Sequence, residues 1–127
     1  MNLTAFAAVG IGAACGAWLR WGLGMLLNAL FAPIPLGTLA ANLLGGLLMG
    51  LVLGAVHSWP ELPPAIKLLL TTGFLGGLTT FSTFSAEGFM LAQRGDWAWF
   101  GVYLVVHVAG SLLLTAAGYA LFNAWRG

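Results

Sequence analysis

Four long apolar stretches occupy nearly all of the 127 residues and constrain the fold more than any other feature. They cover approximately residues 3–31, 36–56, 65–91 and 97–124. About 20 apolar residues are enough for a helix to cross a hydrocarbon core of about 30 Å. Only 6% of the residues are charged, whereas soluble domains carry about 25%. The sequence therefore predicts one all-α integral membrane domain over residues 1–127, with four transmembrane helices in a lipid bilayer.

The scarcity of polar residues also excludes several classes of function. The formal net charge of +1 provides no basic surface for nucleic acid. The single cysteine, Cys15, excludes an internal disulfide and a cysteine-based metal site. The two histidines, His57 and His107, are fifty residues apart and lack the spacing of a zinc site. We expect no nucleic-acid partner and no soluble protein partner.

The positive charges leave the orientation in the membrane open. With four spans, Lys67 and Arg126 lie on the side of both termini, Arg94 lies on the other side, and Arg20 falls within the first span. An excess of Lys and Arg normally marks the cytoplasmic side, and here the charges nearly balance. Either the insertion machinery resolves a weak bias, or the chain inserts both ways and forms an antiparallel homodimer.

Small and polar residues form a line with a spacing of four along the second span: Thr38, Asn42, Gly46, Gly50 and Gly54. Residues at this spacing share one helix face. The glycines form small-xxx-small patterns, which allow helix backbones to approach closely in lipid. The line therefore predicts helix packing. A buried amide requires hydrogen-bond partners, so Asn42 either ties helices together or faces a hydrated pathway.

Two other spans carry polar groups at similar spacing. In the first span, Arg20 follows Gly12 and Gly16 and precedes Gly24. An intramembrane arginine faces protein or water, or its long side chain extends to the membrane surface. In the fourth span the line contains Tyr103, His107, Ser111 and Thr115. This second line indicates a hydrated track or a polar helix contact, and we favour the track.

The third span contains a run that is unlike an ordinary helix, from Gly76 to Ser85. Seven of its ten residues are Gly, Ser or Thr, which weaken helices. Non-helical backbone at this depth survives only where it is buried in protein or lines water. The run predicts a broken third helix, and the alternative is a continuous helix whose hydroxyls bond to preceding carbonyls. Phe81 and Phe84 are usual packing residues, although their positive ring edges could replace part of the hydration of an anion.

The run GFLGGLTTFSTFSAE at 73–87 resembles the signature of the bacterial fluoride channels, the Fluc or CrcB family. Further similarity lies in GAWLRW at 16–21 and PLGTLAAN at 35–42. The resemblance covers all four spans in order. It implies a passive, fluoride-selective channel in the bacterial cytoplasmic (inner) membrane that exports cytoplasmic fluoride. It also implies an antiparallel homodimer of dual topology with two pores and a structural sodium ion at its centre.

The resemblance implies roles for individual residues. Along the fluoride pore it places Phe81, Phe84, Asn42, Thr38, Tyr103, Ser111, Thr80 and Ser82. It gives the backbone carbonyls of Gly76 and Thr79 to sodium, and it places Arg20 in a vestibule near a pore entrance. His107 lies between Tyr103 and Ser111, where a small or neutral polar residue is expected. Its imidazole either narrows the route and brings pH sensitivity or points into a helix contact.

Three other functions compete with a channel. A proton-coupled small multidrug transporter needs a carboxylate in the first span, and this first span has none. Glu87 is the one acidic residue well inside a span, and it follows the predicted break. An intramembrane enzyme needs a nucleophile near a base, and the sequence shows no recognisable spacing of such residues. We therefore expect that the chain is not an enzyme. A helix scaffold for partners is the third alternative.

Overall fold

The computed structural model describes residues 2–127, and all of its regular structure is helical. The elements are α1 (Leu3–Leu27), α2 (Leu36–Ser58), α3 (Pro64–Leu68), the π-helix η1 (Leu69–Leu75), α4 (Gly76–Leu78), α5 (Phe81–Gln93) and α6 (Trp97–Arg126). The helices from α3 to α5 together form the third span, so four segments are long and apolar enough to cross a membrane. The prediction of four apolar spans is confirmed.

The first helix ends at Leu27, before the predicted end of the first span near residue 31. The Asn28 N–H still bonds to the Gly24 carbonyl at 3.0 Å. Its side-chain Oδ1, however, accepts a hydrogen bond from the Thr38 N–H at 3.1 Å. This bond ties the end of α1 to the first turn of α2, and residues 29–35 form the connection between the two helices.

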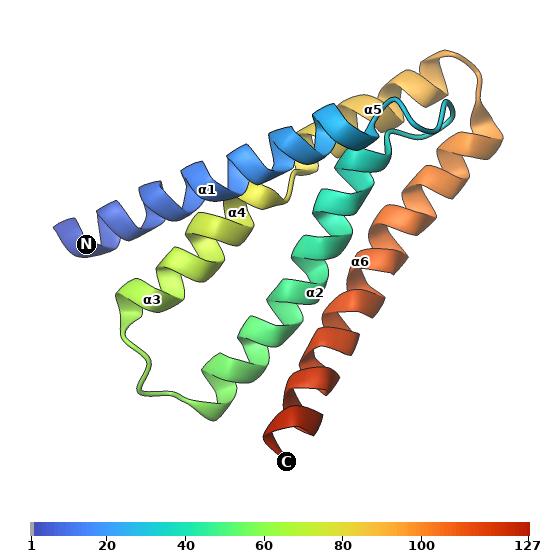
Figure 1. The fold of residues 1–127 in the computed structure, drawn as a ribbon. Helices are drawn as coiled ribbons and strands as arrows, with labels where there is room; N and C mark the ends of the chain where they lie inside the picture. Colours follow the sequence, from blue (N-terminus) through green and yellow to red (C-terminus); the bar gives the residue numbers. More distant parts are fainter. Residues whose placement is uncertain (1) are drawn as a thin grey trace.

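The spans are arranged as two pairs (Figure 1). α1 lies along the third span, and α2 lies along α6. Within each pair the two helices run in the same direction, while the two pairs run in opposite directions. This arrangement places the middle of the third span beside α2 and opposite the middle of α6.

Glycines allow close contact within the α2–α6 pair. A Cβ atom on Gly46 would lie 2.8 Å from the Ser111 carbonyl oxygen, and one on Gly50 would overlap the Thr115 carbonyl oxygen. The Thr115 hydroxyl donates to the Gly46 carbonyl oxygen at 2.9 Å. These contacts confirm the prediction that the glycine line of the second span packs against another helix.

A second set of glycines joins α1 to the third span. A Cβ on Gly16 would overlap the Phe74 carbonyl oxygen, and one on Gly77 would overlap the Ala13 carbonyl oxygen. Gly12 and Gly73 face each other in the same contact, with 3.1 Å between the Gly12 Cα and the position of a Gly73 Cβ. Backbone therefore packs directly on backbone between α1 and the third span.

The backbone of the third span leaves the helical conformation at two residues between α4 and α5. Thr79 has φ −85° and ψ 156°, and Thr80 has φ −147° and ψ 116°, so both are extended. The Thr80 Oγ1 accepts the Thr83 N–H at 3.0 Å, which is the N-cap that starts α5. The extended stretch is much narrower than the run of ten residues noted in the sequence, because the residues on both sides of Thr79 and Thr80 are helical.

Candidate functional site

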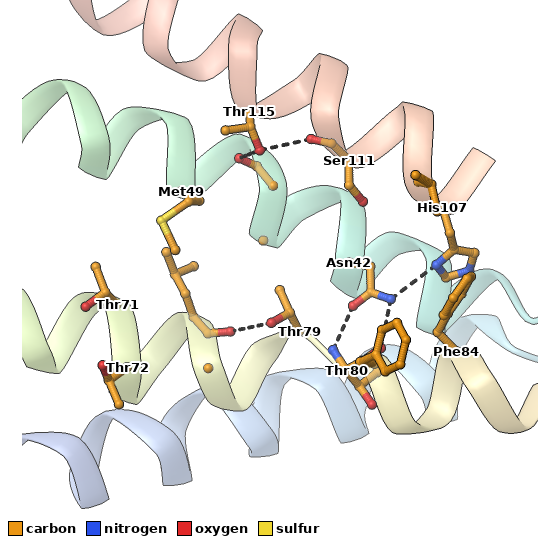
Figure 2. Close-up of a pocket in the computed structure, with 16 residues that line it drawn as sticks. Asn42, Met49, Thr71, Thr72, Thr79, Thr80, Phe84, His107, Ser111 and Thr115 are labelled. Carbon is orange, nitrogen blue, oxygen red and sulfur yellow. Dashed lines mark hydrogen bonds between the residues drawn. The ribbon is translucent and has the colours of Figure 1, made fainter. Parts of the chain in front are cut away.

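A cavity of about 600 Å³ lies between the third span and the α2–α6 pair (Figure 2). It brings together eight of the predicted site residues: Asn42, Gly76, Thr79, Thr80, Phe81, Phe84, His107 and Ser111. Thr38, Ser82, Tyr103 and Arg20 do not line it. The cavity wall combines glycine, threonine and aromatic side chains with the extended residues of the third span.

The Asn42 side chain holds the backbone at the extended residues. Its Oδ1 accepts the Thr80 N–H at 2.8 Å, and its Nδ2 donates to the Thr80 carbonyl oxygen at 3.1 Å. The same Nδ2 lies 3.1 Å from Nδ1 of His107 (Figure 2). Both N–H groups of the amide are therefore used. Asn42 thus ties α2 to the third span and to α6, which was one of the two roles considered for it from the sequence.

Two carbonyls near the extended residues have lost the donors that a continuous helix would provide. In an α-helix, a carbonyl accepts from the N–H four residues later, so Gly76 would pair with Thr80, and Thr79 with Thr83. Here the Thr80 N–H bonds to the side chain of Asn42, and the Thr83 N–H bonds to the Thr80 hydroxyl. Both Gly76 and Thr79 line the cavity.

The two phenylalanines of the run have different surroundings. Phe81 is 79% exposed in the single chain. Phe84 stacks on Tyr103, with ring centroids 5.4 Å apart and planes at 11°, and lies 4.9 Å from the His107 ring. The centroids of Phe81 and Phe84 are 5.7 Å apart. Phe84 thus belongs to an aromatic stack beside the cavity, while Phe81 extends the same face outward.

Most polar side chains in the line along α6 bond to protein groups. The Tyr103 hydroxyl donates to Glu87 at 2.7 Å, and the Thr115 hydroxyl lies 2.9 Å from the carbonyl oxygens of Gly46 and Ser111. His107 contacts Asn42. Three of the four members therefore take part in polar helix contacts, and His107, Ser111 and Thr115 also line the cavity.

Glu87, which was not among the predicted site residues, joins two that were, Thr38 and Tyr103, in a second polar cluster. Its two carboxyl oxygens accept from the Thr38 hydroxyl at 2.9 Å and from the Tyr103 hydroxyl at 2.7 Å. Thr38 and Tyr103 are both buried. An acidic residue inside a span needs such partners, so its isolation in the sequence was the signal that could have identified this cluster.

The remaining predicted residues lie on either side of the extended stretch. The Arg20 Nε donates to the Gly77 carbonyl oxygen at 3.0 Å, so the guanidinium faces protein within the α1 contact. The hydroxyls of Ser82 and Thr80 are 3.4 Å apart. Among residues 2–127, no cluster of three or more His, Cys, Asp or Glu side chains could hold a metal ion.

The sequence around this site matches a known protein family. Residues 7–119 match the sequence model of the family described as "CrcB-like protein, Camphor Resistance (CrcB)". The chain belongs to the CrcB family. This match contains the whole extended stretch and most of all four spans.

Several relatives of this CrcB-family chain carry the name "Fluoride-specific ion channel FluC". The protein from Aromatoleum aromaticum is 68% identical over 99% of this chain and 96% of its own length. Those from Cupriavidus necator and Pseudomonas putida are each 57% identical, over 93% and 94% of this chain and 94% of their own lengths. The name is that of a channel, in agreement with the expectation that the chain is not an enzyme. Family membership and four apolar helices make it a multi-pass protein of the bacterial inner membrane.

Proposed function

We propose that this chain is a passive, fluoride-selective channel that lets cytoplasmic fluoride leave the cell. The observation that carries this proposal is the cavity, where the aromatic rings of Phe81 and Phe84 adjoin extended backbone held by Asn42. The positive edges of aromatic rings attract anions, and rigid backbone keeps such rings in place. The names of relatives that are 57–68% identical supply the identity of the ion.

The working form we propose is an antiparallel homodimer with two pores, each lined by both subunits. Phe81, 79% exposed in the single chain, lies beside a cavity that the single chain leaves incomplete on one side. Gly76 is also exposed, and a Cβ there would meet only the Thr71 carbonyl oxygen at 3.6 Å. A second copy packing on this face would cover both residues. The nearly balanced positive charges permit the dual topology that such a dimer needs.

A structural sodium ion fits the carbonyls at the centre of this face. Gly76 and Thr79 would hold it, because the N–H groups that would normally occupy their carbonyls are bonded to Asn42 and to the Thr80 hydroxyl. Carbonyls exposed where a membrane helix is interrupted commonly coordinate sodium. Such an ion supplies a positive field and satisfies these oxygens. We also propose that Arg20 lies in the vestibule of the pore. Its bond to the Gly77 carbonyl oxygen places its positive charge near the extended residues Thr79 and Thr80.

Fluoride holds its water strongly, so a selective pore must replace that water closely. In the proposed route, ring edges and the hydroxyls of Thr80, Ser82 and Ser111 perform this replacement. Thr38 and Tyr103 lie farther along the proposed route, where their hydroxyls donate to Glu87. A fixed cation inside the pore would trap the ion, and neutral donors avoid this. In acidic surroundings fluoride is protonated to neutral HF, which enters the cell and dissociates in the cytoplasm. The membrane potential then drives the fluoride anion out through a passive pore.

Efflux from liposomes that contain only this protein tests the proposal. Vesicles loaded with potassium fluoride and given valinomycin should release fluoride, and vesicles loaded with potassium chloride should retain chloride. This result separates a channel from a proton-coupled transporter, an enzyme and a scaffold. Absence of fluoride release, or equal release of chloride, would refute the channel.

Substitution of the rings tests the mechanism. Phe81→Ile and Phe84→Ile keep apolar volume but remove the positive ring edges, so each should reduce fluoride efflux by at least about tenfold, the size of a 1.4 kcal/mol effect. Size-exclusion chromatography in detergent identifies variants that keep the wild-type dimer. Normal efflux from both dimeric variants would contradict the role of the rings.

A further inference from the structure

His107 contains the most unusual polar group beside the cavity. The residue is 3% exposed, and its Nε2 has no hydrogen-bond partner among residues 2–127. Its Nδ1 lies 3.1 Å from Nδ2 of Asn42, and the rings of Tyr103 and Phe84 lie at 4.3 and 4.9 Å from the imidazole. A buried polar atom without a partner destabilises the fold. The imidazole therefore needs a physical reason to be there.

The hydrogen bonds around Asn42 fix the chemical state of this imidazole. A backbone N–H only donates, so the Asn42 atom 2.8 Å from the Thr80 nitrogen must be the amide oxygen. The amide nitrogen then faces the Thr80 carbonyl and His107. Because an amide nitrogen only donates, Nδ1 of His107 must accept. His107 is therefore neutral, with its proton on Nε2.

A proton on Nδ1 is incompatible with this arrangement. Two donors would then face each other across 3.1 Å between Asn42 and His107. Rotation of the amide by 180° would offer an oxygen to His107. The same rotation would turn the amide nitrogen toward the Thr80 N–H and the amide oxygen toward the Thr80 carbonyl, so both bonds to Thr80 would be lost.

We propose that His107 is a positioning residue for the fluoride path: its unprotonated Nδ1 holds the Asn42 amide in the one orientation that clamps Thr80. This proposal rests on the proposed channel function. Thr80 caps α5, and Phe81 and Phe84 occupy the first turn of that helix. The imidazole thus acts on the rings through Asn42 and Thr80, without touching the ion.

The other ionisable groups near His107 come from two elements. Tyr103 lies one turn earlier on α6, and Glu87 of α5 accepts its hydroxyl at 2.7 Å. The only ionisable side chain on α2 is His57, at the far end of that helix from Asn42. Glu87 is occupied by hydroxyl donors from Tyr103 and Thr38, so the neutral amide of Asn42 is the group that meets Nδ1.

Two isosteric substitutions separate this role from direct contact with fluoride. The side-chain oxygen of Asn can take the place of the acceptor Nδ1, and the side-chain nitrogen of Gln can reach the place of the donor Nε2. We expect His107→Asn to keep fluoride efflux within about threefold of wild type, and His107→Gln to lose about tenfold, as expected for one buried hydrogen bond. Only variants that elute as the wild-type dimer are compared.

The opposite pattern, with efflux kept in His107→Gln and lost in His107→Asn, would overturn the proposal in favour of a contact through Nε2. Equal efflux in both variants, whether normal or reduced, would also overturn it. His107→Ala lacks both atoms and should resemble His107→Gln. Its rate and pH profile in planar bilayers should differ from those of wild type, and identical profiles would show that the histidine has no role in the pore.

A spectroscopic measurement tests the clamp without any flux. The ¹⁵N spectrum of wild-type protein labelled on histidine should show His107 at pH 7.5 as the neutral form with a protonated Nε2. Acidification until the spectrum shows imidazolium should lower the wild-type current and leave the His107→Asn current unchanged. A proton on Nδ1 at pH 7.5 would overturn the clamp even if efflux is normal. If wild type conducts no fluoride, the channel proposal fails, and this spectrum still decides the clamp.

Discussion

The two faces of the third span are covered in different ways. Toward α1, Gly77 packs so closely that a Cβ would overlap the Ala13 carbonyl oxygen. Toward the cavity, the neighbouring Gly76 has open space, and Phe81 is exposed. Both glycines are helical with negative φ, so backbone conformation does not explain either of them. The chain covers one face by itself and leaves the other open, where we propose that a second copy packs.

Alanine at the two glycines tests this difference most strongly. Gly77→Ala forces the α1 backbone away and should destabilise the fold by about 1–3 kcal/mol, as overpacking does. Gly76→Ala is the matched control and should leave the fold of the single chain intact while weakening the proposed dimer. Thermal unfolding in detergent and size-exclusion chromatography measure the two effects. Equal loss of stability in both variants would show that the faces do not differ.

The clamp on the cavity face should give the next largest effect. Asn42→Ala leaves the N–H and carbonyl of Thr80 without partners, and a buried unsatisfied group costs about 1–3 kcal/mol. Fluoride efflux should fall at least about tenfold, a 1.4 kcal/mol effect, while the α1 contact stays intact. Asn42→Asp keeps an acceptor for the Thr80 N–H but turns a carboxylate oxygen toward the Thr80 carbonyl and Nδ1 of His107, so efflux should fall at least as far. Wild-type efflux in Asn42→Ala would show that the extended residues need no side-chain support.

On the packed face, substitution of Arg20 should have a smaller effect on stability and efflux. Its Nε bonds to the Gly77 carbonyl, and hydrogen bonds to charged groups contribute about 1.5–3 kcal/mol. Arg20→Gln removes the charge and this donor, so it should lower thermal stability near the bottom of that range and reduce efflux. Arg20→Lys retains the charge as a control. If Lys restores efflux but not stability, the charge and the hydrogen bond have separate effects.

The smallest effect should come from the α2–α6 contact, where Thr115 lines the cavity but its hydroxyl is bonded to backbone carbonyls of both helices. Thr115→Val removes the hydroxyl bonded to the Gly46 carbonyl and preserves the shape of the side chain. Hydrogen bonds between membrane helices average about 0.6 kcal/mol, so unfolding should shift slightly and efflux should stay near wild type. A loss of efflux as large as that of Asn42→Ala would mean that this contact also controls the route.

Hydropathy and spacing predicted the features of the fold that depend on one helix at a time. Apolar length located the four spans, and the glycine line of the second span correctly indicated packing. The end of the first helix was placed too late, because the bond from Thr38 to the Asn28 side chain joins residues ten positions apart. Apolar content alone gives no indication of that contact.

The candidate site was harder to predict because it depends on how helices cross. The run of Gly, Ser and Thr indicated the region, but it could not show that Thr79 and Thr80 alone are extended. That position is fixed by Asn42, 38 residues away in sequence from Thr80. The polar line on α6 was visible in the sequence, yet spacing alone did not distinguish a track from the contacts made by Tyr103, His107 and Thr115. Glu87 received no role because its partners lie on other helices.

The paired bonds between Asn42 and Thr80 have a consequence for which amino acids position 42 can accept. The amide behaves like a peptide group of an adjacent β-strand, offering one donor and one acceptor in a fixed order at a fixed distance. Glutamine has the same groups on a longer arm, serine is too short to span both, and aspartate lacks the donor. A saturation screen for growth in fluoride should therefore recover almost exclusively asparagine at position 42. At lipid-facing positions nearby it should recover a broad range of residues.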